Sequence, residues 1–488
     1  MQYLKMVSFA TLIGLANCSS VNAQTASIKA VETHLMPHIQ MKDSAFVHFT
    51  ISERLQFYAI PSVSIAVIHN GKVAWAKAYG SADVSLRQPA TSQTLYQAAS
   101  MSKTANAAAV MRLVQQHRLS LDTDIRRYLK TWAFPDNAFS KGSAITLKNL
   151  LSHTAGINVR GFAGYERGAA LPSLNEILNG TAPANNEAVK PIGKPGNQMA
   201  YSGGGTVIVQ KILEDQIDAD YAQLIKTEVL KPLGMNHSTY AMPPDQSAAT
   251  AYDTHLKPVA GKYFIYPELA PAGLWTTPAD FSKLVMAIQA SLMGKTPGFL
   301  TKENAAMMLK PVSDSTNTAL GCFIYKIGGD TYFTHDGHNA GFLAAFYGSM
   351  TRGEGVVIML NSDNNGIIPE ILNSVAVTYQ WKDFYQPEIK TASAMPPDSL
   401  LNTYAGEYYC EKLKKSILLR KGPSCLEMHQ ELEFHKGEGC FEKIYFFDDR
   451  TFFVNTSDLI WKFQKTQTGN GPLLNIIDGN DKYTAIKR

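Results

Sequence analysis

The stretch Tyr96-Gln-Ala-Ala-Ser100-Met-Ser-Lys103-Thr-Ala-Asn-Ala-Ala-Ala-Val-Met-Arg-Leu-Val114 decides how the rest of the chain is interpreted. From Ala105 onward it consists mostly of Ala and larger apolar residues, which favours a helix buried on most sides. Ser100 and Lys103 are three residues apart and share one face of that helix. A serine needs a base within hydrogen-bonding distance to act as a nucleophile, and a desolvated lysine amine can be that base. The alternative for the pair alone is a capping serine beside a solvated lysine.

The first 23 residues have the composition of an export signal. Lys5 precedes an apolar run from Met6 to Ala16, and a small-x-small ending predicts cleavage after Ala23. The run is too short for a permanent membrane helix, and no later stretch is long enough either. We therefore expect an exported protein, periplasmic or secreted, without a transmembrane helix. As an alternative, Leu15-Ala-Asn-Cys18 resembles the box at which bacterial lipoproteins are lipidated, which would tether the protein at Cys18.

Length and charge exclude several classes of protein. The 488 residues exceed what one hydrophobic core usually holds, so we expect two domains. A net charge of +4, with both signs interspersed, argues against a nucleic-acid surface. Three cysteines, Cys410, Cys425 and Cys440, fit one disulfide in an oxidising compartment, although their spacing neither fixes the pairing nor matches a zinc site.

The order of apolar patterns predicts an α+β domain over residues 24–385. Two alternating runs, Ser62–Ile68 and Lys72–Tyr79, flank His69-Asn-Gly71, a strong hairpin signal. A mostly helical middle follows, interrupted by a long, weakly periodic segment, 160–194, of the kind that forms lids or binding walls. Strand patterns return at 322–326, 331–334, 342–348 and 355–360, and a helix at 367–381 closes the domain. Such a chain builds one antiparallel sheet from its two ends, with flanking helices and an inserted helical subdomain.

The remaining residues predict a second, all-β domain. Residues 386–398 are rich in proline and lack periodicity, which is typical of a linker. Over 399–488 short apolar strands recur at intervals of about 8 to 12 residues, which indicates a small barrel or sandwich.

Two further motifs could join Ser100 and Lys103 in a site. Tyr201-Ser-Gly203 lies on a glycine turn before a helix, where a tyrosine can project into a cleft and exchange a proton with a serine. His335-Asp-Gly337-His338 lies between two strand patterns, where a cation beside small residues would leave room for a substrate along the strand edge. Taken singly, the first could be a core tyrosine and the second a solvated surface loop.

In this order the three motifs resemble the signatures of the serine beta-lactamase and penicillin-binding protein superfamily. The branch is that of class C beta-lactamases, DD-carboxypeptidases, D-aminopeptidases and related esterases. Three companion phrases support the resemblance: Leu150-Leu-Ser-His-Thr-Ala-Gly-Ile157, Pro232-Leu-Gly-Met-Asn236 and Gly273-Leu-Trp-Thr-Thr-Pro-Ala-Asp280. The C-terminal strands are similar to the lipocalin-like barrel that some of these hydrolases append.

The resemblance implies a role for each motif residue. Ser100 would be the acylated nucleophile, Lys103 its proton partner, and Tyr201 the general base and acid. His335 would be the cation of the third motif. The backbone N–H groups of Ser100 and His338 would form the oxyanion hole, and Gly203 and Gly337 would lie against the substrate. No cofactor or metal is implied, and the chain lacks a Gly-x-Ser-x-Gly elbow, a His-Glu-x-x-His motif and a phosphate loop.

Two departures from the superfamily pattern bear on the substrate. Gly203 replaces an Asn whose side chain hydrogen-bonds the substrate amide, and His335 replaces a more usual Lys. Both argue against a dedicated beta-lactamase and favour an exported hydrolase of small esters, amides or D-amino-acid peptides. The alternative is a slow-turnover penicillin-binding or sensor protein that is acylated without efficient hydrolysis.

Overall fold

The chain forms two compact units. The computed structural model describes residues 24–42, 48–196, 198–296, 298–313, 316–393, 395–413, 415–422, 425–431, 442–454, 459–464, 472–479 and 481–488. The first unit comprises residues 60–365 and 381–384 with residues 24–28, and the second comprises 29–59, 366–380 and 385–488. The expected export signal and Cys18 lie outside the described residues.

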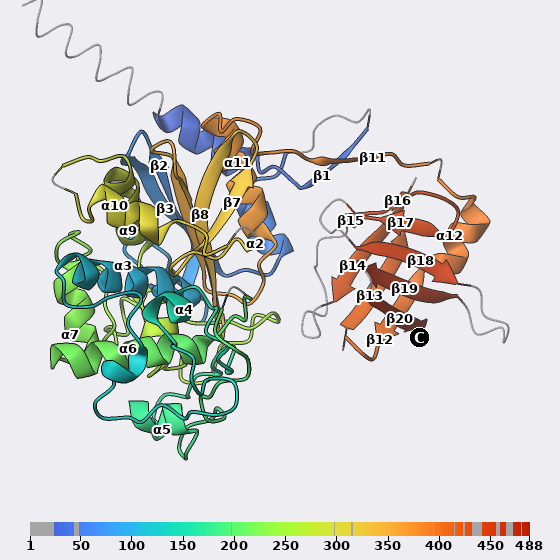
Figure 1. The fold of residues 1–488 in the computed structure, drawn as a ribbon. Helices are drawn as coiled ribbons and strands as arrows, with labels where there is room; N and C mark the ends of the chain where they lie inside the picture. Colours follow the sequence, from blue (N-terminus) through green and yellow to red (C-terminus); the bar gives the residue numbers. More distant parts are fainter. Residues whose placement is uncertain are drawn as a thin grey trace, which may run out of the picture. The chain divides into compact units, whose positions relative to one another are not determined.

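An antiparallel sheet forms the frame of the first unit. In the described residues it has seven strands, in the order β4-β3-β2-β10-β9-β8-β7. They are β2 (Ser62–His69), β3 (Lys72–Asp83), β4 (Gln88–Pro89), β7 (Phe323–Ile327), β8 (Asp330–Asn339), β9 (Phe342–Ser349) and β10 (Gly355–Leu360). Figure 1 labels β2, β3, β7 and β8 of this sheet. Asn70 and Gly71 turn the β2–β3 hairpin with positive φ, as an Asn-Gly turn requires. Strands from both ends of the unit meet where β2 pairs with β10, which confirms the predicted sheet.

Helices inserted between β4 and β7 cover this frame. They are α3 (Ser102–Gln115), α4 (Leu147–Leu151), α5 (Leu174–Asn179), α6 (Gly203–Ile217), α7 (Tyr221–Ile225), α8 (Leu269–Ala272), α9 (Pro278–Leu292) and α10 (Lys302–Met308), with a short strand pair of β5 (Tyr96–Gln97) and β6 (Trp275–Thr276). The Thr277 side chain caps α9, with Pro278 in its first turn, and α9 packs on β2 and β10. The α+β fold predicted from the sequence is confirmed.

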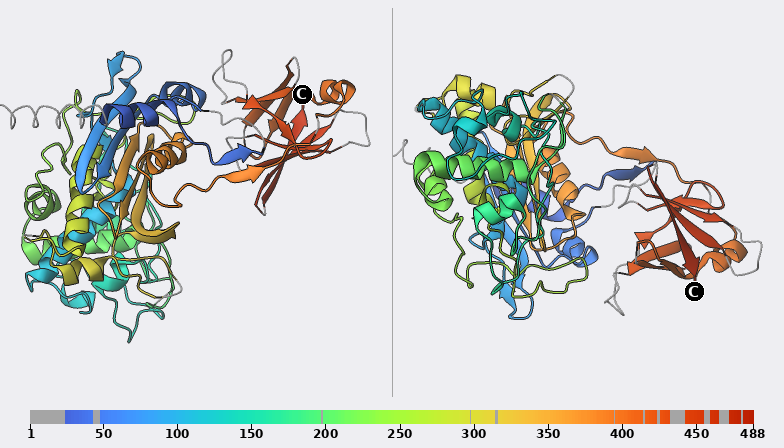
Figure 2. Two further views of the ribbon diagram at one scale, coloured as in Figure 1. Left: turned by 90° about the horizontal axis from the view of Figure 1, so that it is seen from above. Right: turned by 60° about the horizontal axis from the view of Figure 1, so that its bottom comes forward.

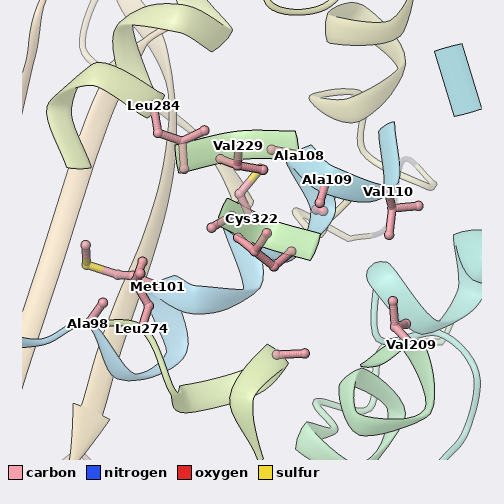
Figure 3. Close-up of a cluster of buried hydrophobic side chains, with 14 of the residues drawn as sticks. Ala98, Met101, Ala108, Ala109, Val110, Val209, Val229, Leu274, Leu284 and Cys322 are labelled. Atoms are coloured by element: carbon pink, nitrogen blue, oxygen red, sulfur yellow. The ribbon is translucent and has the colours of Figure 1, made fainter. Parts of the chain in front are cut away.

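Helix α3 is the buried centre of the first unit. Figure 3 shows Ala108, Ala109 and Val110 of α3, with Met101 just before the helix, in an apolar cluster with side chains from other elements, among them Val209 of α6 and Leu284 of α9. The alanines are needed because backbone approaches this helix closely. A Cβ on Gly321 would lie 2.5 Å from Ala107 Cβ and 2.6 Å from the Lys103 carbonyl oxygen.

The second unit contains a small all-β barrel, as expected. In the described residues its sheet has nine strands, in the order β15-β14-β13-β12-β20-β19-β18-β17-β16, drawn in orange to red in Figure 2. They are β12 (Gly406–Cys410), β13 (Lys415–Lys421), β14 (Leu426–Glu431), β15 (Glu442–Lys443), β16 (Tyr445–Phe446), β17 (Thr451–Phe453), β18 (Ile460–Gln464), β19 (Leu473–Asp478) and β20 (Asp481–Lys487). A single residue, Ile444, separates the two outer strands, so the sheet closes on itself.

Aromatic side chains fill the barrel. Phe452, Trp461 and Phe463 are buried in its core, and Tyr404 of α12 (Asp398–Tyr404) stacks on Phe463 with ring centroids 3.6 Å apart. Cys410 and Cys425 are not joined to each other, and Cys440 lies outside the described residues.

The rest of the second unit includes α2 (Ile51–Phe57), α11 (Ile367–Thr378) and a parallel pair of β1 (Ile39–Met41) with β11 (Glu388–Lys390). Residues 386–398, for which we expect a linker, therefore include a short paired strand. Throughout the described residues, no helix combines the length and hydropathy that crossing a membrane would require.

Candidate active site

Ser100 lies on a tight turn immediately before α3. The preceding residue, Ala99, has φ 47°, a left-handed conformation that is rare outside glycine. β8 presses against this turn, since a Cβ on Gly337 would lie only 2.2 Å from the Ala98 carbonyl oxygen. Gly337 is therefore required for packing, and it brings the His338 backbone toward that of Ser100. This approach is what an oxyanion hole made of the two N–H groups needs.

Ser100 Oγ accepts two hydrogen bonds from side chains that sequence reasoning singled out. Lys103 Nζ lies 2.9 Å away, one turn along α3, and also donates to the Pro271 carbonyl oxygen at 3.0 Å. Tyr201 Oη lies 3.0 Å away, from a residue 101 positions along the chain. Lys103 is 4% exposed, so its amine is withdrawn from water. The fold thus gives the serine hydroxyl two neighbours able to exchange a proton with it.

Tyr201 is oriented by the residues around the start of α6. Ser202 caps this helix, because its Oγ accepts the Gly205 N–H at 2.8 Å and donates to the Asn158 carbonyl at 2.6 Å. The Tyr201 ring stacks on Phe323 of β7, and Lys103 Nζ lies 5.1 Å from its centroid. These contacts hold the phenol in one direction, toward Ser100.

His153 is a site residue to which sequence reasoning assigned no role. Its ring centroid lies 4.3 Å from that of Tyr201, and its Nδ1 accepts the Ser202 N–H at 3.2 Å. Burial above all, and then the positive charge of Lys103, hold the pKa of His153 well below its ordinary value. It is therefore a neutral ring that supports Tyr201. The only sequence signal was its place in the companion phrase 150–157.

His335 is buried and electrically neutral, in contrast to the cation expected from the sequence. Burial, followed by repulsion from Lys103, lowers the pKa of His335 to about 3. Its Nδ1 lies 2.6 Å from the Asp336 carbonyl oxygen and must be the donor there, since a carbonyl only accepts. In the neutral ring Nε2 is then an acceptor, and it has no hydrogen-bond partner among the described residues.

The structure gives a steric reason for Gly203. Its φ is not positive, but a Cβ there would lie 3.0 Å from Phe162 Cε2 and 3.2 Å from the Arg160 carbonyl oxygen. The segment 158–162 therefore occupies the space into which a side chain at position 203 would extend. Sequence reasoning noted the missing Asn and could not identify what fills its place.

A pocket of about 680 Å³ opens beside Tyr201 and His335. It is lined by Arg160, Met199, Ala200, Tyr201, Asn317, Phe323, Tyr325, Ile327, Thr334, His335, Asp336 and Tyr347. The edge of β7 contributes aromatic and aliphatic side chains, so the pocket combines an apolar wall with charged groups, as small-molecule sites commonly do.

Comparison with known proteins agrees with this geometry. Residues 49–369 match the family model described as Beta-lactamase. The chain belongs to this beta-lactamase family. The resemblance to the serine beta-lactamase and penicillin-binding protein superfamily is thereby confirmed.

Two curated relatives match part of the chain. Protein flp of Staphylococcus aureus (strain N315) is 30% identical over 236 residues, which cover 47% of this chain and 44% of that protein. A Beta-lactamase of Escherichia coli (strain K12) is 25% identical over 207 residues, covering 42% and 50%. The chain thus spans half or less of the length of these relatives.

Solved structures share the fold. A penicillin-binding protein homologue from Pyrococcus abyssi, described as octameric, has a TM-score of 0.60 at 22% identity, with 90% of this chain and 98% of that chain covered. D-amino acid amidase from Ochrobactrum anthropi SV3, complexed with L-phenylalanine, has a TM-score of 0.54 at 20% identity, covering 66% and 94%. At this level of identity the likeness concerns the fold alone.

Proposed function

We propose that this protein is an exported serine hydrolase that cleaves small esters or amides through an acyl-enzyme on Ser100. The observation that carries the proposal is the convergence on Ser100 Oγ of Lys103 Nζ at 2.9 Å and Tyr201 Oη at 3.0 Å. Either neighbour can take the Ser100 proton at this distance once it has lost its own, which is the arrangement of an activated nucleophile. The family match supports serine hydrolase chemistry in general.

The two neighbours of Ser100 have different positions, which supports different roles in proton transfer. Tyr201 lines the pocket, whereas Lys103 lies behind the serine, bonded to the Pro271 carbonyl. Ser100 Oγ attacks the carbonyl carbon and gives up its proton to this pair, while the backbone N–H groups of Ser100 and His338 receive the oxyanion. Tyr201 faces the substrate, so it returns the proton to the leaving group. In the second half of the reaction it activates the water that releases the acyl group.

The substrate proposal is small esters in preference to amides, with D-amino-acid amides or peptides as the nearest amide class. It is supported by the absence of a side-chain amide at Gly203 and by the neutral ring of His335. The name of the D-amino acid amidase neighbour is compatible with it. Export rests on residues 1–23, and a lipocalin-like character of the barrel rests on the sequence resemblance.

Labelling followed by turnover tests the proposal. A fluorophosphonate should add one adduct to the wild type, on the peptide that contains Ser100, and none to Ser100→Ala. Multiple equivalents of p-nitrophenol per enzyme should then follow from p-nitrophenyl esters. A single stoichiometric burst would favour the slow-turnover sensor instead. A label on Ser102 or Ser202 would remove the central claim.

A further inference from the structure

The segment Asn158-Val-Arg160 is hydrogen-bonded to the residues that follow Tyr201 at the start of α6. Three successive carbonyl oxygens of the segment accept from the start of α6. Asn158 O accepts the Ser202 hydroxyl at 2.6 Å, Val159 O the Gly204 N–H at 3.0 Å, and Arg160 O the Gly203 N–H at 3.2 Å. The backbone of Arg160 is therefore fixed beside the catalytic tyrosine.

The Arg160 side chain is directed to the active-site pocket. Its Cζ lies 5.9 Å from the centroid of the Tyr201 ring, and it lines the pocket with Tyr201 and His335. The residue is exposed, and no carboxylate of the described residues forms an ion pair with its guanidinium. An arginine beside the catalytic tyrosine and without an acidic partner is available to a ligand.

The other basic groups of the site are not available in this way. The Lys103 amine donates hydrogen bonds to Ser100 Oγ and to the Pro271 carbonyl oxygen. The buried ring of His335 offers a hydrogen-bond acceptor rather than a positive charge. Among the pocket-lining residues that the structure describes, Arg160 is therefore the cation left for a substrate. Asp336 also lines the pocket, so the cavity presents one carboxylate as well as the guanidinium, and a test must compare anionic with cationic substrates.

The same segment crowds position 203. Phe162 and the Arg160 carbonyl occupy that space, so the amide expected there is replaced by a guanidinium that enters the pocket from the neighbouring loop. An amide both donates and accepts, whereas a guanidinium only donates and is always charged. Its best complement is a carboxylate, which can accept two parallel N–H bonds.

We propose that Arg160 is a specificity-determining residue that binds a carboxylate on the acyl part of the substrate. This inference rests on the proposed function, because it concerns the group that is transferred to Ser100. The preferred substrates would be esters or amides whose acyl chain carries a negative charge within reach of the scissile carbonyl.

Three p-nitrophenyl esters of matched acyl length test the proposal: the monoester of adipate, the neutral hexanoate and the cationic 6-aminohexanoate. The variants are Arg160→Gln, Arg160→Lys and Arg118→Gln, the last removing an exposed charge after α3. Arg160→Gln should lower the adipate-to-hexanoate ratio of kcat/KM by about 10-fold or more, the usual effect of a lost charge-assisted hydrogen bond. Arg160→Lys should retain part of the ratio, and Arg118→Gln all of it.

The outcomes separate this inference from the proposed function. If the wild type is neither labelled at Ser100 nor turns over any ester, the proposed function fails. Suppose instead that the wild type is labelled at Ser100 and turns over esters. If the adipate-to-hexanoate ratio of kcat/KM is then unchanged in Arg160→Gln, or falls equally in Arg118→Gln, only the role of Arg160 is overturned. A wild-type preference for 6-aminohexanoate would also overturn it and assign recognition to Asp336. Should Arg160→Gln not fold, the wild-type preference for adipate must still weaken with ionic strength.

Discussion

Tyr201 is the residue whose role can be tested with the smallest change. Tyr201→Phe keeps the ring that packs on His153 and Phe323 and removes only the Oη that contacts Ser100. A general acid–base group typically contributes about 10²- to 10⁴-fold, so kcat/KM on a neutral ester should fall by that amount with little change in Tm. Tyr325→Phe removes another phenol from the same pocket and should cost far less. Equal losses in the two variants would mean that Tyr201 only shapes the pocket.

Gly203 gives a second prediction at this scale. Both Gly203→Ala and Gly203→Asn would place a Cβ within 3.0 Å of Phe162 and 3.2 Å of the Arg160 carbonyl. Overpacking of this kind typically costs about 1 to 3 kcal/mol, so both variants should unfold at a lower temperature. Replacing Gly by Asn alone should not create an amide-binding site, since Phe162 and the Arg160 carbonyl crowd the position of its Cβ.

Thermal unfolding of Gly203→Ala and Gly203→Asn, together with their amide and ester kinetics, tests the predicted steric conflict at position 203. A Gly203→Asn protein as stable as the wild type would show that segment 158–162 yields easily. A raised amide-to-ester ratio in that protein would contradict the steric account as well.

Sequence motifs identified the site residues that belong to them, but not those that tertiary packing alone brings to the site. Ser100, Lys103, Tyr201 and His335 were each marked by a spacing, and three of the four meet at one hydroxyl network. The roles of His153 and Arg160 depend on which loop folds over the start of α6. The charge of His335 depends on burial and on its distance from Lys103. None of these quantities is expressed in a local pattern.

At the scale of elements, β8 shows how a local pattern can be read too narrowly. The sequence indicated a strand at 331–334, with the His-Asp-Gly-His motif between it and the next strand, whereas β8 continues from Asp330 to Asn339 and includes the motif. Gly337 weakened the strand signal, although it is there because β8 packs against the turn before Ser100. The segment 160–194, expected to be a lid or a wall, contributes Arg160 to the pocket and carries α5.

Helix α8 gives a pH-dependent prediction through Glu268, the residue that precedes it. Glu268 is fully buried, and neither carboxylate oxygen has a hydrogen-bond partner among the described residues. Burial raises the pKa of Glu268 from its ordinary 4.5 to about 7. Between these two values the unfolded chain releases a proton that the native protein keeps. The free energy of unfolding therefore falls as pH rises through this window and stays lowered above it.

Glu268→Gln removes this titration. At pH 8 the variant should be more stable than the wild type by up to about 3 kcal/mol, and at pH 4 the two should be similar. Urea unfolding at both pH values measures the difference. Glu303→Gln, on the exposed first turn of α10, is the matched control and should show no such pH dependence. If the difference in free energy of unfolding between the wild type and Glu268→Gln is the same at pH 8 and pH 4, the Glu268 carboxyl is solvated.

At the scale of the whole molecule, the sequence predicted two domains from a change of pattern, and each unit has its own core. The apolar cluster of the first unit draws its members from Ile68 to Met359, and that of the barrel from Leu401 to Ala485. What the pattern did not reveal is the pairing of β1 with β11, because three-residue strands carry no detectable alternation.

Two truncations test whether the first core stands alone. A chain that ends at Ala392 keeps β11 paired with β1, whereas one that ends at Gln386 removes β11 and leaves β1 without its partner. Both should fold and be labelled by a fluorophosphonate at Ser100, since the core of the first unit contains no residue beyond Met359. The shorter chain should melt at a lower temperature because an unpaired strand edge is exposed to water.

If the chain ending at Ala392 is insoluble while the full-length protein folds, the barrel is required for the catalytic unit, and the boundary drawn at residues 386–398 is wrong. A soluble but unlabelled Ala392 chain would mean that the barrel is needed for acylation of Ser100 rather than for folding.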